Sequence, residues 1–158
     1  MSTYASKTTV GADKTLSDIR SVLSRYGAEQ FAYMESPHVA TVAFVKSGRQ
    51  IRFTIDLPDR SERQFTHHSR GARTATAAAA AHEQAVRQRW RALLLIIKAK
   101  LEAVESGIVT FDQEFAMHMM LPGGVHVGEA VSGAISRSLD SGATFALQLT
   151  SGTEGGEA

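Results

Sequence analysis

Arginine and histidine side chains are concentrated in residues 58–74, a segment with neither helical nor strand periodicity. The guanidinium group binds phosphate through paired hydrogen bonds, and flat rings stack on bases, so this combination favours a polyanionic ligand. Three further arginines follow in a predicted helix. The candidate nucleic-acid-binding or phosphate-binding residues are Arg60, Arg63, Phe65, His67, His68, Arg70, Arg73, Arg87, Arg89 and Arg91.

The charge of the chain is unevenly distributed along its length. The 158 residues carry a formal net charge of +1, yet residues 46–100 contain twelve basic and four acidic residues, a net charge of +8. The rest of the chain contains five basic and twelve acidic residues, a net charge of −7. Such a cationic segment favours a nucleic acid or another phosphate-bearing ligand. The alternative is a solvated surface that the acidic termini, or a neighbouring subunit, partly neutralise.

A second set of side chains raises the alternative of metal-dependent chemistry. Carboxylates and imidazoles that converge after a strand bind divalent cations and position water for attack on a phosphodiester. The side chains in question, whose spacing matches no metal-binding motif, are Asp56, Asp59, Glu62, His67, His68 and His82. The sequence contains no cysteine and none of the P-loop, dinucleotide-binding, nucleophile-elbow or zincin motifs. We therefore expect a non-enzymatic protein with no cofactor and no bound metal.

The candidate contacts also have a structural interpretation. Phe65 is favoured as an anchor that holds its loop to the hydrophobic core, rather than as a ring that stacks on a base. The arginines would pair with Glu83, Glu102 and Glu105 in this interpretation. Taken together, however, the arginines favour contact with a ligand.

Periodicity predicts a helix followed by three strands. Apolar residues recur at helical spacing over residues 16–26, and Thr15 is the predicted N-cap. The period then changes to two, with a hairpin turn at Ser47-Gly48. The strands predicted from this alternation are 30–34, 39–45 and 51–57.

A long helix is predicted over residues 76–106. Trp90 heads its apolar stripe, so we expect Trp90 in the core. Leu95 and Ile96 lie outside the stripe, which predicts that the C-terminal helices or a second subunit cover them and favours a homo-oligomer. The shorter elements predicted after it are a helix over 110–120, a helix over 127–139 and an edge strand over 145–149.

The predicted fold class is α+β, with an N-terminal helix, a three-stranded antiparallel meander, a long cationic helix and a small helical C-terminal part. The longest apolar run, 92–97, is far shorter than the ~20 residues that span a bilayer, and no apolar signal segment is apparent. We therefore expect a cytoplasmic protein with no membrane partner. The predicted divisions are a flexible arm (1–14), one domain (15–150) with a long basic loop (58–75), and a disordered acidic tail (151–158).

Two segments resemble small uncharacterised proteins encoded by bacteriophages and prophages. They are residues 65–71 (FTHHSRG) and residues 88–105 (QRWRALLLIIKAKLEAVE), and the likeness extends over about residues 15–124. The resemblance implies a phage factor in DNA replication, recombination, packaging or anti-defence, and no catalytic role carries over from it. The order of helix, three strands and long helix is similar in topology to double-stranded-RNA-binding domains and to the cores of phage single-strand annealing proteins.

These observations lead to one expected function and two alternatives. We expect a phage-type nucleic-acid-binding protein whose contacts tolerate different base sequences and which favours single strands. It would act as an annealing, recombination or replication accessory. The first alternative is an anti-defence protein that sequesters small nucleotides, or inhibits a host protein, through the same basic loop. The second is an oligomeric structural or assembly protein that uses Leu95 and Ile96.

Overall fold

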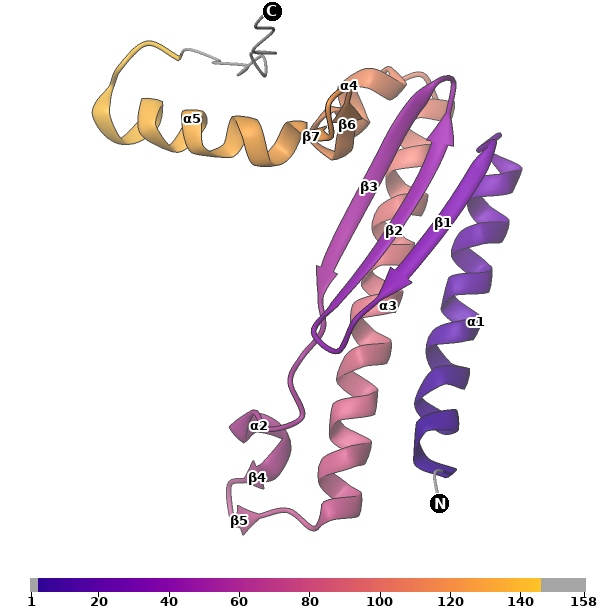
Figure 1. Ribbon diagram of the computed structural model, residues 1–158, viewed down its shortest axis with the longest axis vertical. Coiled ribbons are helices and arrows are strands. Elements are labelled where there is room, and N and C mark those ends of the chain that lie inside the picture. The colour runs from indigo at the N-terminus through magenta and orange to yellow at the C-terminus, as the bar shows by residue number, and fades with distance from the viewer. Residues whose placement is uncertain (1–2, 146–158) are drawn as a thin grey trace, which may run out of the picture.

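The molecule is built from two long helices, an antiparallel sheet and a smaller C-terminal part. The computed structural model describes residues 3–145, with side chains from Ala12 onward. Figure 1 shows the two long helices running alongside the sheet. This arrangement confirms the predicted α+β class. The main elements are α1 (Thr3–Arg25), β1 (Gln30–Glu35), β2 (Val39–Lys46), β3 (Arg49–Asp56) and α3 (Ala75–Glu105).

The three long strands form an antiparallel meander, and buried side chains alternate with more exposed ones along β2 and β3. The register of β2 and β3 places Lys46 opposite Arg49, so the hairpin loop consists of Ser47 and Gly48. Both loop residues have positive φ, 52° and 71°, as a two-residue turn of this kind requires. The predicted hairpin turn is confirmed.

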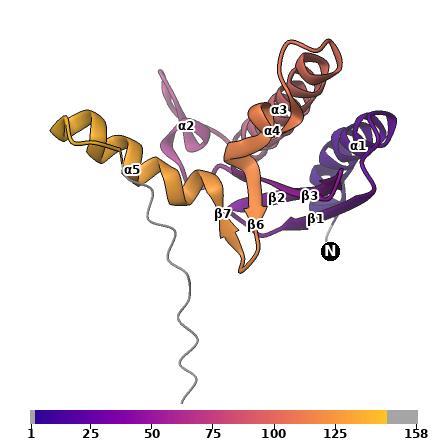
Figure 2. The ribbon, with the colours of Figure 1, turned by 90° about the horizontal axis from the view of Figure 1, so that it is seen from above.

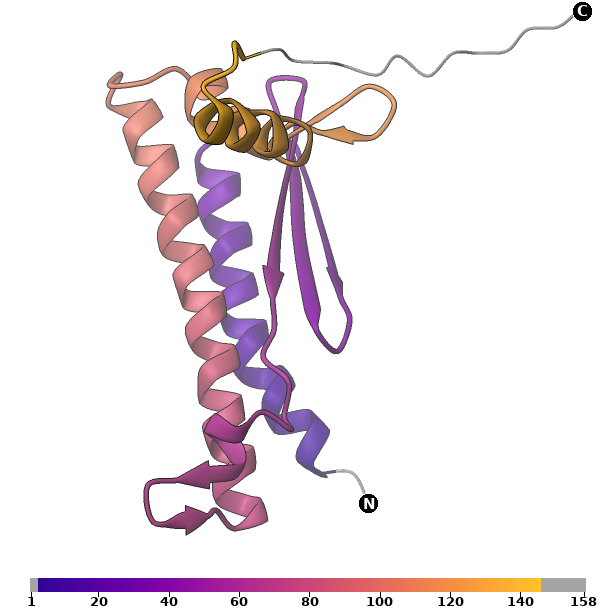
Figure 3. The ribbon, with the colours of Figure 1, turned by 90° about the vertical axis from the view of Figure 1, so that its left-hand side faces the viewer.

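The hydrophobic core lies between one face of the meander and the two long helices. Figures 2 and 3 show α1 and α3 on the same side of the sheet. Trp90 of α3 is fully buried, as its place at the head of the apolar stripe predicts, and its ring centroid lies 5.8 Å from that of Tyr33. Because α3 is held along the sheet, the segments that precede and follow it lie at opposite ends of the molecule. Other large core side chains are Ile19, Leu23, Val42, Phe44, Ile51, Ile97 and Leu101.

The first helix is longer than its periodicity predicts. α1 begins at Thr3 rather than near Leu16, so it runs through most of the predicted arm, residues 1–14. Thr15, the predicted N-cap, is a buried residue inside the helix. α1 extends beyond its apolar pattern because a helix that has already been nucleated grows at little cost through residues without such a pattern.

The helix predicted over residues 110–120 ends early. Thr110 and Gln113 form the predicted capping box at the start of α4 (Phe111–Phe115). A 3₁₀ turn, η1 (Ala116–His118), then leads the chain out of the helix. The prediction is therefore correct at the start of the helix and wrong for its second half.

The residues after η1 extend the sheet. β6 (Met119–Leu121) pairs with β3, and β7 (Val125–His126) pairs with β6, which gives the strand order β1-β2-β3-β6-β7. Backbone N–H and C=O groups at the edge of β3 pair with these residues. No local sequence pattern predicts this pairing.

α5 (Val127–Ser141) confirms the last predicted helix. The described part of the chain ends shortly after it. α5 packs on η1, β6 and β7, at the end of the molecule where α3 ends. Among the residues described, no helix combines the length and apolar character needed to span a membrane. Apart from Phe145, the predicted strand 145–149 and the predicted tail 151–158 lie outside the described residues.

His118 of η1 lies in surroundings that disfavour its charged form. Its ring stacks on Phe53, with 4.1 Å between the ring centroids. Burial, followed by the nearby charges of Lys100 and His126, lowers the pKa of His118. Because the fold favours the neutral ring, the associated stability is fully present above the ordinary pKa of 6.5. It is lost as the pH falls through that value toward the lower pKa of the folded state.

We therefore expect the melting temperature to fall when the pH is lowered from about 7.5 to about 5.5. His118→Gln has no titrating ring, so its melting temperature should fall less over the same interval. Each kcal/mol lost on acidification lowers the Tm of a chain of this size by about 2–4 °C. Scanning calorimetry of both proteins at both pH values measures the difference, and an equal fall would contradict the role given to His118.

Candidate nucleic-acid interface

The segment between β3 and α3 folds into a small projection. Residues 58–75 are predicted to be an irregular loop, but they contain α2 (Arg63–Thr66) and a hairpin of β4 (His67–His68) and β5 (Gly71–Ala72). These elements are too short to leave a periodic pattern, so the sequence could not predict them. Residues 58–74 are termed the basic extension. Figures 1 and 3 show it at the end of the molecule where α3 begins, far from α5.

Phe65 anchors the basic extension to α3. Its side chain is 4% exposed, and its ring lies edge-on to that of His82 with 5.3 Å between centroids. His82 is also buried, and its Nε2 lies 2.8 Å from the carbonyl oxygen of Pro58. A buried ring is not available to stack on a base, so the structure favours the anchoring interpretation of Phe65.

The acidic residues of the basic extension are occupied by hydrogen bonds within their own turn. Glu62 Oε1 accepts a hydrogen bond from the Asp59 N–H at 2.8 Å. Asp59 Oδ1 accepts from both the N–H and the hydroxyl of Ser61, at 2.7 Å and 2.6 Å. The hydrogen bonds from Ser61, with a smaller effect from His38, hold the pKa of Asp59 below its ordinary value. Neither carboxylate forms an ion pair with an arginine of the extension among the described residues.

The arginines of the basic extension lack acidic partners in the described part of the chain. Arg60, Arg63 and Arg70 are exposed. Arg73 is half-buried, and its Nε donates to the carbonyl oxygen of His67 at 3.2 Å. Within residues 12–145, no carboxylate lies within ion-pair distance of these four side chains. The extension therefore presents four arginines without an ion pair, against two acids, at one end of the molecule.

The two histidines of the basic extension are held by its short hairpin. His67 Nδ1 lies 2.9 Å from the hydroxyl of Thr66. His68 Nδ1 accepts a hydrogen bond from the Arg70 N–H at 3.0 Å. Since Nδ1 is the acceptor, Nε2 of the neutral ring carries the proton and is a donor. His68 is exposed, so it offers a flat ring and an N–H donor beside Arg70.

The three predicted arginines of α3 lie on different sides of that helix. At 100° per residue, Arg89 lies on the same side as His82, which faces the basic extension. Arg87 and Arg91 lie on the opposite border, toward α1. Of the three, Arg89 alone is therefore placed to continue the positive surface of the extension, although all three are exposed.

Other cations of the segment 46–100 form ion pairs with acidic residues of the same chain. Arg49 donates through Nε and Nη2 to the two carboxylate oxygens of Asp112, at 3.0 Å and 2.9 Å. This contact also lowers the pKa of Asp112. Further ion pairs join Arg52 to Glu129, Lys100 to Glu114 and Arg87 to Glu83. Among the described cations of this segment that form no ion pair, four lie together in the basic extension, whereas Arg89, Arg91 and Lys98 lie along α3.

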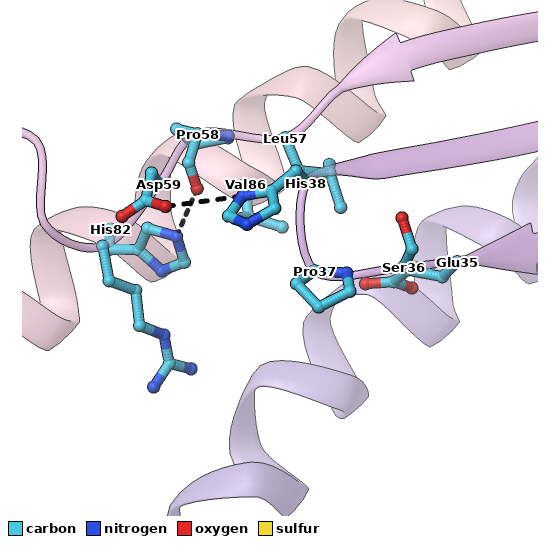
Figure 4. A pocket seen from close by; sticks show the side chains of 10 residues that line it. Glu35, Ser36, Pro37, His38, Leu57, Pro58, Asp59, His82 and Val86 are labelled. Atoms are coloured by element: carbon cyan, nitrogen blue, oxygen red, sulfur yellow. Dashed lines mark hydrogen bonds and ion pairs between the residues drawn. The ribbon is translucent and has the colours of Figure 1, made fainter.

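A cavity of about 440 Å³ lies at the root of the basic extension. Figure 4 shows that its walls come from the β1–β2 turn, the end of β3 and α3. His38 Nδ1 lies 3.4 Å from Asp59 Oδ2, and Arg60 lines the same cavity. His82 also lines it, and the buried Nδ1 of His82 has no hydrogen-bond partner among the described residues. The sequence offers no sign of this cavity, because three separated stretches of chain form it.

The side chains weighed for a metal site do not form one. Within residues 12–145, no group of three or more His, Asp and Glu side chains is placed to hold a metal ion. Asp59 and Glu62 accept hydrogen bonds from their own turn, and His82 is engaged by Pro58 and Phe65.

Comparison with known proteins leaves the geometry as the basis for assigning a function. The chain matches no model of a protein family, no curated protein and no solved structure. The unpaired arginines of the basic extension, and the cavity at its root, are the two features from which a function can be argued.

Proposed function

We propose that the protein binds nucleic acid through the basic extension. The observation that carries this proposal is the exposure of Arg60, Arg63 and Arg70, with Arg73 beside them and no acidic partner in the described residues. A guanidinium group binds phosphate strongly because it donates two parallel hydrogen bonds to one anion. Arginines already paired with carboxylates gain less, so the unpaired arginines of the extension are the preferred contacts.

The shape of the basic extension supports sequence-tolerant binding to single strands. An α-helix or a two-stranded ribbon that enters the major groove is needed to read base edges there. β4 and β5 have two residues each and α2 has four, so the extension is built to contact phosphates rather than to follow a groove. The exposed ring of His68 beside Arg70 is suited to stacking on an unpaired base.

We propose a non-enzymatic accessory role for this binding, in annealing, recombination or replication. We include the phage context in this proposal, as the sequences of residues 65–71 and 88–105 led us to expect. Residues 65–71 include most of the β4–β5 hairpin, which belongs to the proposed contact surface.

A fluorescence anisotropy titration with a labelled single strand of about 30 nucleotides tests the proposal. With four arginines on phosphates, affinity should fall about 50-fold between about 50 mM and about 200 mM salt. A strand of the same sequence with an uncharged backbone is the matched control and should bind at least about tenfold more weakly at low salt. Absence of binding at about 50 mM salt, or equal binding of the uncharged strand, would refute the proposal.

The cavity at the root of the basic extension favours a second candidate, a protein that binds small nucleotides as a sponge or as an inhibitor of host defence. Arg60 and His38 line the cavity and are placed to contact phosphate. The volume lies within the usual range for ligand pockets. Adding linear and cyclic nucleotides to the same titration separates the candidates, because a sponge binds them tightly and ignores the long strand.

A further inference from the structure

The cavity at the root of the basic extension adjoins the proposed contact surface, because Arg60 belongs to both. Its volume of about 440 Å³ lies in the lower part of the usual range for ligand pockets, about 300–1,000 Å³. On the α3 side the cavity ends at His82 and Val86, which are 7% and 6% exposed. The cavity therefore has room for one nucleoside, and a strand that enters it cannot leave through α3.

The apolar side chains of the cavity suit a flat base. Leu57 and Pro58 lie at the end of β3, Pro37 lies in the β1–β2 turn, and Val86 lies on α3, as Figure 4 shows. Apolar contacts of this kind remove the faces of a base from water without reading its edge. A base held in this way agrees with binding that tolerates different base sequences.

The charged side chains of the cavity differ between its two sides. Asp59, which Arg60 follows in the chain, lies on one side in Figure 4, and Glu35 lies on the other. Asp59 is already engaged, since Oδ1 accepts hydrogen bonds from Ser61 and Oδ2 lies 3.4 Å from His38 Nδ1. Among the described residues, neither Arg60 nor Glu35 forms an ion pair. A phosphate is therefore favoured beside Arg60 and disfavoured beside Glu35.

We propose that the cavity holds the terminal nucleoside of a single strand, with its phosphate beside Arg60 and its free hydroxyl toward Glu35. An internal nucleotide is flanked by two phosphates, so inserting it would bring the second phosphate to the carboxylate of Glu35. A terminal nucleoside has a hydroxyl in that place, and the hydroxyl can donate a hydrogen bond to the carboxylate. The inference rests on the proposed binding of nucleic acid, and it adds that the protein prefers the end of a strand to its interior.

A strand without ends tests this preference. A single strand of about 30 nucleotides, labelled at an internal base, is titrated as a linear molecule with hydroxyl ends and as a closed circle of the same sequence. Both should bind through the arginines of the basic extension, and the circle should bind about tenfold more weakly because it has no terminal base to insert. Equal affinities would overturn the inference and leave binding through the extension intact. Absence of binding by both strands at about 50 mM salt would refute the proposed function, and the inference with it.

Phosphates at both ends of the linear strand give a second test, in which the inference and simple charge attraction predict opposite results. The added phosphates make the strand more negative, so a protein that only attracted charge would bind it more tightly. We expect the phosphorylated strand to bind about tenfold more weakly than the strand with hydroxyl ends, because its terminal phosphates would face Glu35. Equal or tighter binding would overturn the inference.

A variant of Glu35 locates the effect in the cavity. Glu35→Gln removes the charge while its amide oxygen can still accept the hydrogen bond from the Tyr33 hydroxyl. Terminal phosphates should weaken binding to this variant by less than about threefold. Glu105→Gln is the matched control, because Glu105 is an exposed acid at the far end of α3, and its variant should keep the difference of about tenfold. A difference that persists in full in Glu35→Gln would overturn the placement of the strand end.

Discussion

Replacing Phe115 with alanine is expected to lower the free energy of unfolding by about 3–5 kcal/mol. Phe115 ends α4 and is fully buried against the sheet. Its ring centroid lies 6.0 Å from that of Phe44, 6.3 Å from that of Phe53 and 4.5 Å from that of Phe111. Alanine would remove these ring contacts and leave a cavity between α4 and the sheet. Since domains are ordinarily stable by about 5–15 kcal/mol, the variant would lose a large fraction of that stability.

Urea denaturation followed by circular dichroism measures this loss. Phe145→Ala is the matched control, because Phe145 is 45% exposed, and its substitution should cost less than about 1 kcal/mol. Phe115→Leu should recover part of the stability, since leucine refills much of the space. A cost below about 1 kcal/mol for Phe115→Ala would show that α4 is not docked on the sheet as described.

Replacing Arg63, Arg70 and Arg73 together with glutamine should lower the affinity for a single strand by on the order of 100-fold at about 50 mM salt. Each phosphate that the variant no longer neutralises removes about 0.7 from the slope of log affinity against log salt, so the slope should fall by about 2 in magnitude. The three side chains make no ion pair within the described residues, and the anchor Phe65 is kept. The fold should therefore be retained, which a thermal melt of the variant checks.

A matched control distinguishes the effect of the basic extension on affinity from the effect of the overall net charge. Arg20 and Arg25 of α1 and Arg137 of α5 are exposed and lie on other elements. Their combined replacement with glutamine changes the net charge by the same amount and should alter affinity by less than about threefold. Equal losses of affinity in the two triple variants would mean that overall charge determines binding, and would contradict a site in the extension.

Periodicity predicts the long helices and the meander because each of them buries one face. Trp90 shows this directly, since it heads the apolar stripe and is fully buried. The same reasoning misses β6, because Met120 meets Gln50 only when the distant chain segments have come together. It also misses the first turns of α1, where backbone hydrogen bonds extend the helix without an apolar pattern to signal it.

The residue types of the candidate site are visible in the sequence, whereas its charge balance is not. Arg49 and Arg52 belong to the same cationic segment as Arg63, and nothing local distinguishes the three. The fold pairs Arg49 with Asp112 and Arg52 with Glu129, carboxylates far along the chain, and leaves Arg63 unpaired among the described residues. Long-range pairing therefore decides which arginines are available to a ligand, and a residue count cannot show it.

The 31 residues of α3 give this helix a length of about 46 Å. The basic extension precedes the first residue of α3, and the C-terminal part packs where α3 ends, so the helix acts as a spacer of about 46 Å between them. A ligand held by the extension would leave the opposite end of the molecule free for a second contact.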